Sequence, residues 1–395
     1  MTDPFSLPEG FPAPDPDALA ISRDLVAHQQ QQIDAGGGWL AFDAWMETAL
    51  YTPGLGYYAA GATKFGAAGD FITSPMVSPL FAWTLAAEAR RLLRQGGDTI
   101  LEFGPGDGLL ARDLLQELHR LDALPARYLL LERSADLRDR QAATLATLPL
   151  EVRRRVSWLD RLPDEPIRGL VLANEVADAL PVKRFRRETD GVVELGVVRD
   201  GDGFQWQGRA TPAANTVVDT LEREAGDRFP AGYESEWCPQ LPPWVASIAE
   251  VLDFGAALLV DYGYPRGEYY LAERRRGTLR CHYRHRAHDD PFMLPGLQDI
   301  TAHVDFTAAA EAAVSAGAEL LGFATQAHYL MGAGVTDILQ ARMAQEPARQ
   351  LELAQQAKTL LLPGEMGERF RVLGFAKGGD PGLTGFSTYN HVNRL

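Results

Sequence analysis

The chain has few cysteines, no long apolar run and no excess of basic residues. Its 395 residues include only Cys238 and Cys281, too few for a disulfide framework and typical of a reducing compartment. No apolar stretch approaches the ~20 residues of a membrane-spanning helix, which argues against membrane insertion. Residues 1–20 carry neither the apolar core of a signal peptide nor the arginine-rich pattern of a transit peptide. We therefore expect a cytoplasmic protein of bacterial type.

The charge balance is acidic. The formal net charge is −15, from 38 Lys and Arg against 53 Asp and Glu. An acidic surface repels phosphate backbones, so nucleic acid is not expected as a main partner. The same field favours a cationic small molecule or a basic protein segment. Whether the chain forms a homodimer is left open.

The N-terminal part of the chain has helical periodicity. Apolar residues recur at helical spacing over 18–35, 41–50 and 80–95, and a loop rich in Gly and Pro covers 51–79. Loops of that length are uncommon unless they have a function. The expectation is a flexible tail over 1–17, followed by a helical N-terminal region, 18–97, that contains a lid loop.

From residue 98 onward, strands, loops and helices alternate. This pattern predicts a parallel sheet with helices on its faces. The expected strands are short apolar runs at 99–103, 128–132, 156–159, 170–173, 257–261, 319–325 and 369–376. The expected helices lie at 109–121, 134–146, 242–253 and 305–316.

Three segments interrupt this alternation. Residues 184–210 alternate polar and apolar side chains and predict an inserted hairpin, 263–300 form a polar loop, and 335–360 are helical. The predicted fold class is therefore α/β. Its ranges are a core over 98–183 and 242–378, an inserted β-hairpin region over 184–241, and a helical insert over 326–366.

A glycine-rich turn follows the first strand of the expected sheet. Gly104, Pro105 and Gly106 lie between the strand 99–103 and a helix, with Glu102 just before them. Such a turn lets a ligand approach the backbone and the free N–H groups of the helix N-terminus. A dinucleotide fingerprint requires a third glycine where this chain has Leu109, so the spacing instead resembles motif I of class I methyltransferases. A plain strand-to-helix turn is the alternative.

Acidic residues follow the next two strands. Glu132 ends the second strand, where a carboxylate can accept two hydrogen bonds from a ribose diol. Asp160 follows the third strand and could reach the adenine side of a nucleoside. The alternatives are a solvated acid at a helix start for Glu132 and an ordinary turn residue for Asp160.

The fourth strand leads into a polar corner. Asn174, Glu175 and Asp178 come just past the strand 170–173, on the same side of an open sheet as the glycine turn. Helix capping would explain Asn174 and Glu175. It would not explain the second acid, Asp178, one turn further on.

Several motifs occur in a fixed order over residues 20–377. They are Tyr51 and Pro53 with Gly56-Tyr57-Tyr58, Gly69–Pro75, Glu102–Gly106, Asn174-Glu175 with Asp178–Pro181, Asp261-Tyr262-Gly263, Gly277-Thr278-Leu279, Asp299–Phe306 and Met366-Gly367-Glu368. This series resembles the MidA family, which includes a mitochondrial arginine methyltransferase of complex I assembly. The resemblance implies a class I (Rossmann-like) methyltransferase that uses S-adenosylmethionine. Val176 and Ala177 depart from the two aromatic residues usual in the family, which bears on the acceptor.

The resemblance also suggests roles for individual residues. It implies that Asp70, Thr73 and Ser74 form a lid over the cofactor. If the acceptor is arginine, Glu175 and Asp178 are the candidates to grip its guanidinium, with Asn174 orienting the acceptor or the cofactor amine. The predicted substrate-binding residues are Asp261, Tyr262, His303 and Asp305.

A metal site and three other classes of protein are the alternatives. His282, His285 and His288 share a spacing of three, but Arg284 and Arg286 lie between them and would repel a cation, so no metal is expected. A non-catalytic assembly factor and a small-molecule methyltransferase stay open. A nucleotide-dependent oxidoreductase is disfavoured, because the third glycine and an obvious hydride-relay residue are both lacking.

Overall fold

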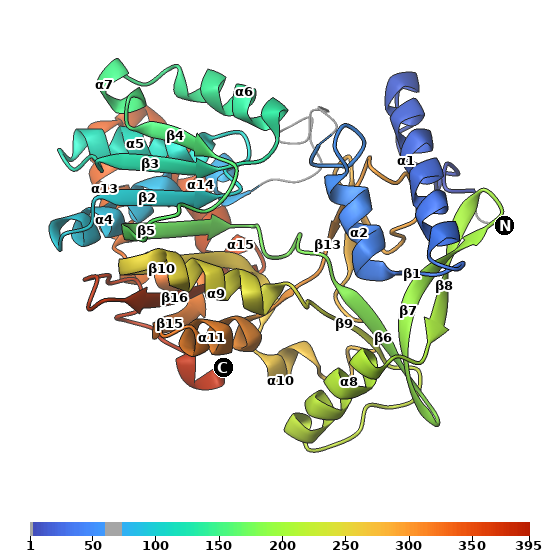
Figure 1. The fold of residues 1–395 in the computed structure, drawn as a ribbon. Coiled ribbons are helices and arrows are strands. Elements are labelled where there is room, and N and C mark those ends of the chain that lie inside the picture. The colour runs from blue at the N-terminus through green and yellow to red at the C-terminus, as the bar shows by residue number, and fades with distance from the viewer. Residues whose placement is uncertain (1–2, 60–72) are drawn as a thin grey trace. The chain divides into compact units, whose positions relative to one another are not determined.

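The chain forms two compact units, each built from three separate stretches of sequence. The computed structural model describes residues 3–59 and 73–395. The first unit comprises 1–71, 178–240 and 266–303, and the second comprises 72–177, 241–265 and 304–395 (Figure 1).

The second unit is built on an eight-stranded sheet, which confirms the predicted α/β class. Its strands are β2 (Thr99–Phe103), β3 (Arg127–Leu131), β4 (Val156–Leu159), β5 (Ile167–Asn174), β10 (Leu252–Tyr264), β14 (Val304–Asp305), β15 (Glu319–Thr325) and β16 (Phe370–Lys377). Their order is β15-β16-β10-β5-β2-β3-β4, and β14 adds to β10. Strands β4, β3, β2, β5 and β10 are parallel, whereas β16 runs antiparallel to both of its neighbours.

The strand order places a switch point between β2 and β5. The chain moves outward from β2 through β3 to β4, then returns to β5 on the other side of β2. In open α/β sheets, ligands bind beyond the carboxyl ends of the strands at such a reversal. The glycine turn follows β2, and the Asn174 corner follows β5.

Helices cover both faces of this sheet (Figure 1). They are α3 (Ser74–Val77), α4 (Pro79–Arg94), α5 (Leu109–Arg120), α6 (Ala135–Leu145), α7 (Leu150–Arg153), α9 (Leu241–Val251), α11 (Phe306–Ser315), α12 (Gln326–Gly332), α13 (Val335–Gln345), α14 (Gln350–Leu361) and α15 (Met366–Arg369). Apolar side chains of α4, α5, α12 and α14 form one core with the sheet. Helices α9 and α11 pack against each other, and Trp244 of α9 lies edge-on to Phe103 of β2.

The first unit has its own sheets and its own aromatic core. Its elements are α1 (Pro16–Ala35), β1 (Leu40–Ala41), α2 (Phe42–Tyr51), β6 (Lys183–Glu188), β7 (Gly191–Asp200), β8 (Gly203–Arg209), α8 (Pro212–Ala225), β9 (Glu234–Trp237), α10 (Arg266–Tyr269), β11 (Arg280–Tyr283), β12 (Arg286–His288) and β13 (Asp299–Thr301). One sheet has the order β1-β7-β6-β9 with β8 on β7, and another has the order β12-β11-β13. Trp45, Phe204, Trp206 and Phe292 pack ring against ring between these elements.

The elements differ from the sequence-based expectation in three places. Residues 263–300, expected as a polar loop, contain α10 and the β11–β13 sheet. Helix α8 and strand β9 extend the segment expected only as a hairpin. The expected flexible tail is tied down from residue 3 onward, because Leu294 N donates to Pro4 O and Phe11 packs edge-on against His288.

The units also divide the chain differently from the ranges drawn on the sequence. Residues 72–97 group with the sheet, because α4 buries one face against it. Residues 266–303 group with the first unit, because buried side chains among them, such as Cys281, Phe292 and Ile300, belong to the core of that unit. None of the helices among residues 3–59 and 73–395 is both long and apolar enough to cross a bilayer.

Candidate functional site

The glycine-rich turn takes a backbone conformation that side chains disfavour. Gly104, Gly106 and Gly108 have φ angles of 55°, 57° and 82°, all in the left-handed region. A Cβ on Gly104 would lie 3.0 Å from Val176 Cγ2. The glycine turn and the Asn174 corner therefore lie side by side in the second unit.

The carboxylate after β3 is held by two donors. Glu132 is buried, and its Oε1 accepts from Ser134 N at 2.8 Å while its Oε2 accepts from Gln141 Nε2 at 3.2 Å. Burial raises the pKa of Glu132, and the two hydrogen bonds oppose that rise. Gln141 Nε2 also donates to Gly106 O at 2.9 Å, so this side chain links the glycine turn to Glu132.

Glu102, predicted to bind the cofactor, is turned toward a neighbouring strand. Its Oε2 accepts a hydrogen bond of 2.6 Å from the hydroxyl of Tyr128 in β3, and both residues are buried. Burial raises the pKa of Glu102 to about 7, although the bond from Tyr128 acts in the opposite direction. The carboxyl is therefore partly protonated near neutral pH.

Glu102 should make folding stability depend on pH. Because its pKa is raised from 4.5 to about 7 in the folded chain, its stabilising contribution is full below pH 4.5 and is lost as pH rises through 7. The loss is about 3 kcal/mol. Glu102→Gln mimics the neutral acid, so the free energy of unfolding of the variant relative to wild type should rise by that amount between pH 4.5 and 8. Urea titrations without cofactor would measure it, and a constant difference across that range would contradict the assignment.

The corner after β5 contains a strained acidic residue. Glu175 has φ of 55°, a left-handed conformation that costs a residue with a side chain about 1–2 kcal/mol. Its Oε1 accepts from Asn174 Nδ2 at 3.1 Å and from Ser74 N at 3.4 Å. None of the described residues donates to the buried Oδ1 of Asn174. That oxygen can accept a hydrogen bond from a ligand amine.

Asp261 shapes this corner from the adjacent strand. Its Oδ2 accepts from Val176 N at 3.2 Å and from Ala177 N at 2.9 Å, and its Oδ1 accepts from Tyr262 N at 2.8 Å. These contacts hold the backbone past Glu175, and the predicted role of Asp261 in substrate binding stays a prediction. Tyr262 is half-buried against Phe370, with ring centroids 4.0 Å apart.

Ser74 links the corner to the helical insert. Its hydroxyl donates to Gln326 Oε1 at 2.9 Å, and Gln326 Nε2 donates to Leu360 O at 3.2 Å. Ser74 and Gln326 are both fully buried. The start of α12 and the end of α14 thus support the residue whose backbone N–H contacts Glu175.

Three other predicted residues of the second unit, Asp160, Thr73 and Asp305, are not among the hydrogen-bond partners given above. Asp160 is exposed after β4, and Thr73 is half-exposed ahead of α3. Asp305 caps α11 by accepting from Ala308 N at 3.0 Å, so capping is its visible role. Pro105 is buried within the turn, and Asp70 lies outside the described residues.

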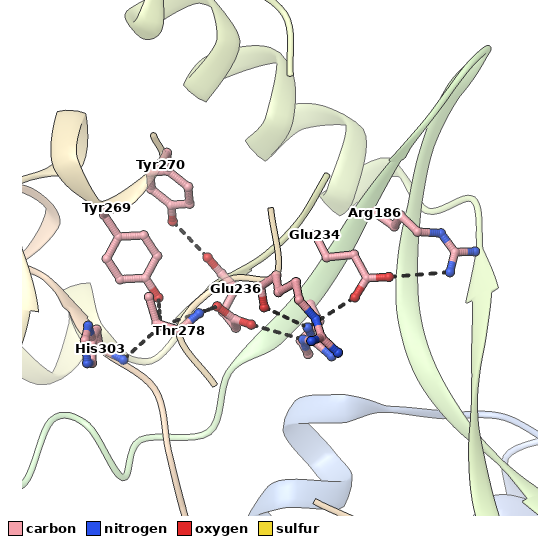
Figure 2. A network of polar contacts seen from close by, with 9 residues as sticks. Arg186, Glu234, Glu236, Tyr269, Tyr270, Thr278 and His303 are labelled. Carbon is pink, nitrogen blue, oxygen red and sulfur yellow. Dashed lines mark hydrogen bonds and ion pairs between the residues drawn. The ribbon is translucent and has the colours of Figure 1, made fainter. Parts of the chain in front are cut away.

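His303, predicted to bind substrate, belongs to a buried polar network in the first unit (Figure 2). Its backbone N–H donates to Thr278 Oγ1 at 3.0 Å. Thr278 N donates in turn to Glu236 Oε2 at 2.8 Å, and Arg184 Nε donates to Glu236 Oε1 at 3.1 Å. A Cβ on Gly277, which has φ of 70°, would lie 2.3 Å from the Glu236 carboxylate, so only glycine fits there.

Asp178 lies in the first unit, near a row of tyrosines. It is buried, and its backbone oxygen accepts from Ala302 N at 3.0 Å. Tyr51 donates to Ala179 O at 2.8 Å and stacks on Tyr58, which donates to Asp299 Oδ1 at 2.9 Å. The Tyr51–Tyr58 segment and the Asp299 segment, both noted in the sequence, are therefore in contact.

The residues that sequence reasoning missed are polar partners of those it found. Gln141 and Tyr128 hold the two acids of the glycine-turn region, Gln326 holds Ser74, and Glu236 holds Thr278. Gln141 did carry a signal, because it interrupts the apolar stripe of Leu137 and Leu145 on α6. Across the described parts of the chain, no three His, Cys, Asp or Glu residues are grouped to hold a metal.

The sheet order and the glycine turn beside a polar corner are those of a class I methyltransferase. A family model described as "Putative S-adenosyl-L-methionine-dependent methyltransferase" matches residues 81–324. The chain belongs to this family, and the MidA-type resemblance is confirmed. It is a methyltransferase that uses S-adenosylmethionine. The left-handed glycines, the buried Glu132 carboxylate and Asn174 Oδ1 fit such a nucleoside.

Solved and curated relatives agree with this assignment. A Burkholderia thailandensis protein bound to S-adenosyl-homocysteine is 41% identical, with a TM-score of 0.92 over 98% of this chain and 100% of that one. The chain is also similar to Protein arginine methyltransferase NDUFAF7, mitochondrial, from Rattus norvegicus, at 30% identity over 88% of this chain and 83% of the relative. The Drosophila melanogaster homolog is 30% identical over 85% of this chain and 80% of its own length.

The predicted cytoplasmic location is contradicted by these relatives. The curated proteins from rat, human and fly are all named as mitochondrial. The prediction rested on the composition of residues 1–20. Such a segment is weak evidence for location, because targeting signals are short addresses unrelated to the fold.

Proposed function

We propose that this methyltransferase acts on an arginine side chain of a protein, with Glu175 as the residue that grips the guanidinium. The names of the curated relatives support an arginine acceptor. The observation that carries the proposal is the left-handed backbone conformation of Glu175. A left-handed φ of 55° on a side-chain-bearing residue persists only where the surroundings over-determine it, and such strain clusters at functional sites.

The chemistry needs a carboxylate at this corner. S-adenosylmethionine supplies an activated methyl group on a sulfonium. Arginine is protonated at neutral pH, so the protein must hold one nitrogen in line with that methyl group and balance the charge. The N–C bond would form as the C–S bond breaks, S-adenosylhomocysteine would leave, and the proton displaced from nitrogen would pass to a carboxylate or to water. Glu175, aligned by Asn174 Nδ2 and Ser74 N, can pair with the guanidinium in a charge-assisted hydrogen bond.

The other side chains of the second unit complete the proposed site. Gly104, Pro105 and Gly106 would line the methionine part of the cofactor, and Glu132 would accept from the ribose hydroxyls. Asn174 Oδ1 would accept from the cofactor amine. Asp178, His303, Thr73 and Asp160 stay predictions, as does the role of Glu102 toward the cofactor.

A labelling experiment tests this function. Extract from a strain lacking the gene would be incubated with the purified protein and S-adenosylmethionine carrying a tritiated methyl group. The expected result is a labelled protein band whose acid hydrolysate contains methylarginine. Label in a small-molecule fraction would overturn the protein acceptor. Binding of S-adenosylmethionine with no label anywhere would support a non-catalytic assembly factor instead.

A further inference from the structure

A single amide in α6 makes three hydrogen bonds, two of them to parts of the proposed cofactor site. Gln141 is fully buried, and its Nε2 donates to Gly106 O at 2.9 Å and to Glu132 Oε2 at 3.2 Å. Its Oε1 accepts from the indole Nε1 of Trp158 in β4 at 2.8 Å. Both hydrogens of the amide nitrogen and its oxygen are thus in use.

The three partners fix the orientation of this amide. An indole N–H can only donate, so the oxygen of Gln141 must face Trp158. The nitrogen must then face the backbone oxygen of Gly106 and the carboxylate of Glu132, both of which can only accept. A flipped amide would place oxygen against oxygen at two contacts, so only one arrangement satisfies all four residues.

The backbone around Gln141 is fitted to the turn as well. A Cβ on Gly108 would lie 3.3 Å from Gln141 Cα, so α6 approaches the glycine turn closely. Gln141 lies between Leu137 and Leu145 on the buried stripe of α6, where an apolar residue would be the ordinary choice. An amide at this position is costly unless all its hydrogen bonds are made.

From this geometry we propose that Gln141 is a positioning residue for the cofactor, which sets the distance between the glycine turn and the ribose-binding carboxylate of Glu132. The inference rests on the proposed role of Glu132. Gln141 acts through its neighbours, because its own polar atoms are already engaged with Gly106, Glu132 and Trp158. Trp158, in the edge strand β4, fixes the orientation of the amide.

Binding of S-adenosylhomocysteine by calorimetry tests the inference. Gln141→Glu keeps the size and the acceptor for Trp158 but places a second carboxylate against Glu132. We expect it to weaken binding by about 10-fold to 100-fold, the effect of losing a hydrogen bond to a charged group. The KM for S-adenosylmethionine in the labelling assay should rise in proportion, with kcat changed by less than about threefold. A merely structural role would lower the unfolding temperature without this split between KM and kcat.

Further variants separate the outcomes. Gln116→Glu makes the same change on the exposed side of α5 and should bind like wild type. If Glu132→Ala loses binding but Gln141→Glu folds and binds normally, the inference fails and the site proposal stands. If Glu132→Ala also binds normally, the ribose role of Glu132 fails first.

Should Gln141→Glu not fold, Trp158→Phe decides, because it removes the N–H that orients the amide and keeps an aromatic ring in contact with the core. A several-fold loss would support the inference, and unchanged affinity would overturn it.

Discussion

Replacing Glu175 by Gln should lower kcat by about 100-fold or more while leaving the affinity for S-adenosylhomocysteine within about threefold. The amide keeps the shape of the side chain but cannot neutralise a guanidinium, and electrostatic groups of this kind contribute 10²-fold to 10³-fold to turnover. Label transfer to protein and calorimetry would measure the two quantities. Glu165→Gln, at an exposed position between β4 and β5, is the matched control and should keep full activity. Unchanged turnover in Glu175→Gln would refute the proposed grip.

The strain at Glu175 provides a second readout at the same position. Glycine accepts φ of 55° without cost, so Glu175→Gly should relieve about 1–2 kcal/mol of backbone strain. Losing the hydrogen bonds from Asn174 and Ser74 offsets part of this gain. We expect a variant about as stable as wild type in urea and without turnover. A clear loss of stability would mean that Glu175 is kept for the fold rather than for the acceptor.

Replacing Glu236 by Leu should destabilise the first unit by about 3–5 kcal/mol, because it leaves the buried guanidinium of Arg184 without its main partner. Glu236 is fully buried and accepts from Arg184 Nε and Thr278 N. Arg184 keeps a weaker pair with Glu234 at 3.3 Å, a hydrogen bond to Arg276 O at 3.5 Å and its position over the ring of Trp206. The free energy of unfolding in urea would measure the loss.

Two comparisons make the Glu236 result specific. Asp34→Asn removes an ion pair with Arg199 in the same unit, but both of those side chains are about half exposed, so the expected change is below about 1 kcal/mol. The double variant Arg184→Leu with Glu236→Leu should recover part of the stability, since no uncompensated buried charge is left. If Glu236→Leu and Asp34→Asn lowered the free energy of unfolding by the same amount, burial of the Arg184–Glu236 pair would make no difference to stability.

The local features of the second unit were predictable from sequence. Strand β2, the glycine turn and helix α5 follow one another directly, so neighbouring residues determine them. The corner at Asn174 was found because three polar side chains follow a buried strand. Strand alternation cannot show backbone strain, however, and the left-handed φ of Glu175 came only from the structure.

The partners of these residues were not predictable, because they come from distant parts of the chain. Tyr128 of β3 donates a hydrogen bond to Glu102 of the adjacent strand β2, 26 residues away in the sequence. Ser74 donates to Gln326, which lies 252 residues away. The carboxylate of Asp261 accepts hydrogen bonds from the backbone of residues 176 and 177, which are 85 and 84 positions away in the sequence. A single sequence gives residue types and local spacing, but not which polar groups satisfy one another.

The prediction of a loop over 263–300 was wrong for a different reason. Strands β11, β12 and β13 have three or four residues each, and two of them pair across a long connection. Segments this short carry too few alternating positions to distinguish a strand from a turn. Charged residues such as Arg280 and Arg286 lie on exposed positions of these strands. They make the segment polar on average, so the buried positions, Cys281 and Tyr283, do not stand out in the sequence.

The interleaving of the two units has a consequence for biogenesis. The first unit needs strands from as late as β13, and the second needs β16, which pairs with both β15 and β10 in its sheet. Domains usually fold as units while the chain emerges from the ribosome. Here neither unit can close its hydrophobic core until translation has passed residue 303, so the growing chain exposes apolar surface for most of its synthesis. The first unit is complete once residue 303 has emerged, whereas the second still lacks β15 and β16, so both units close late and the sheet of the second closes last.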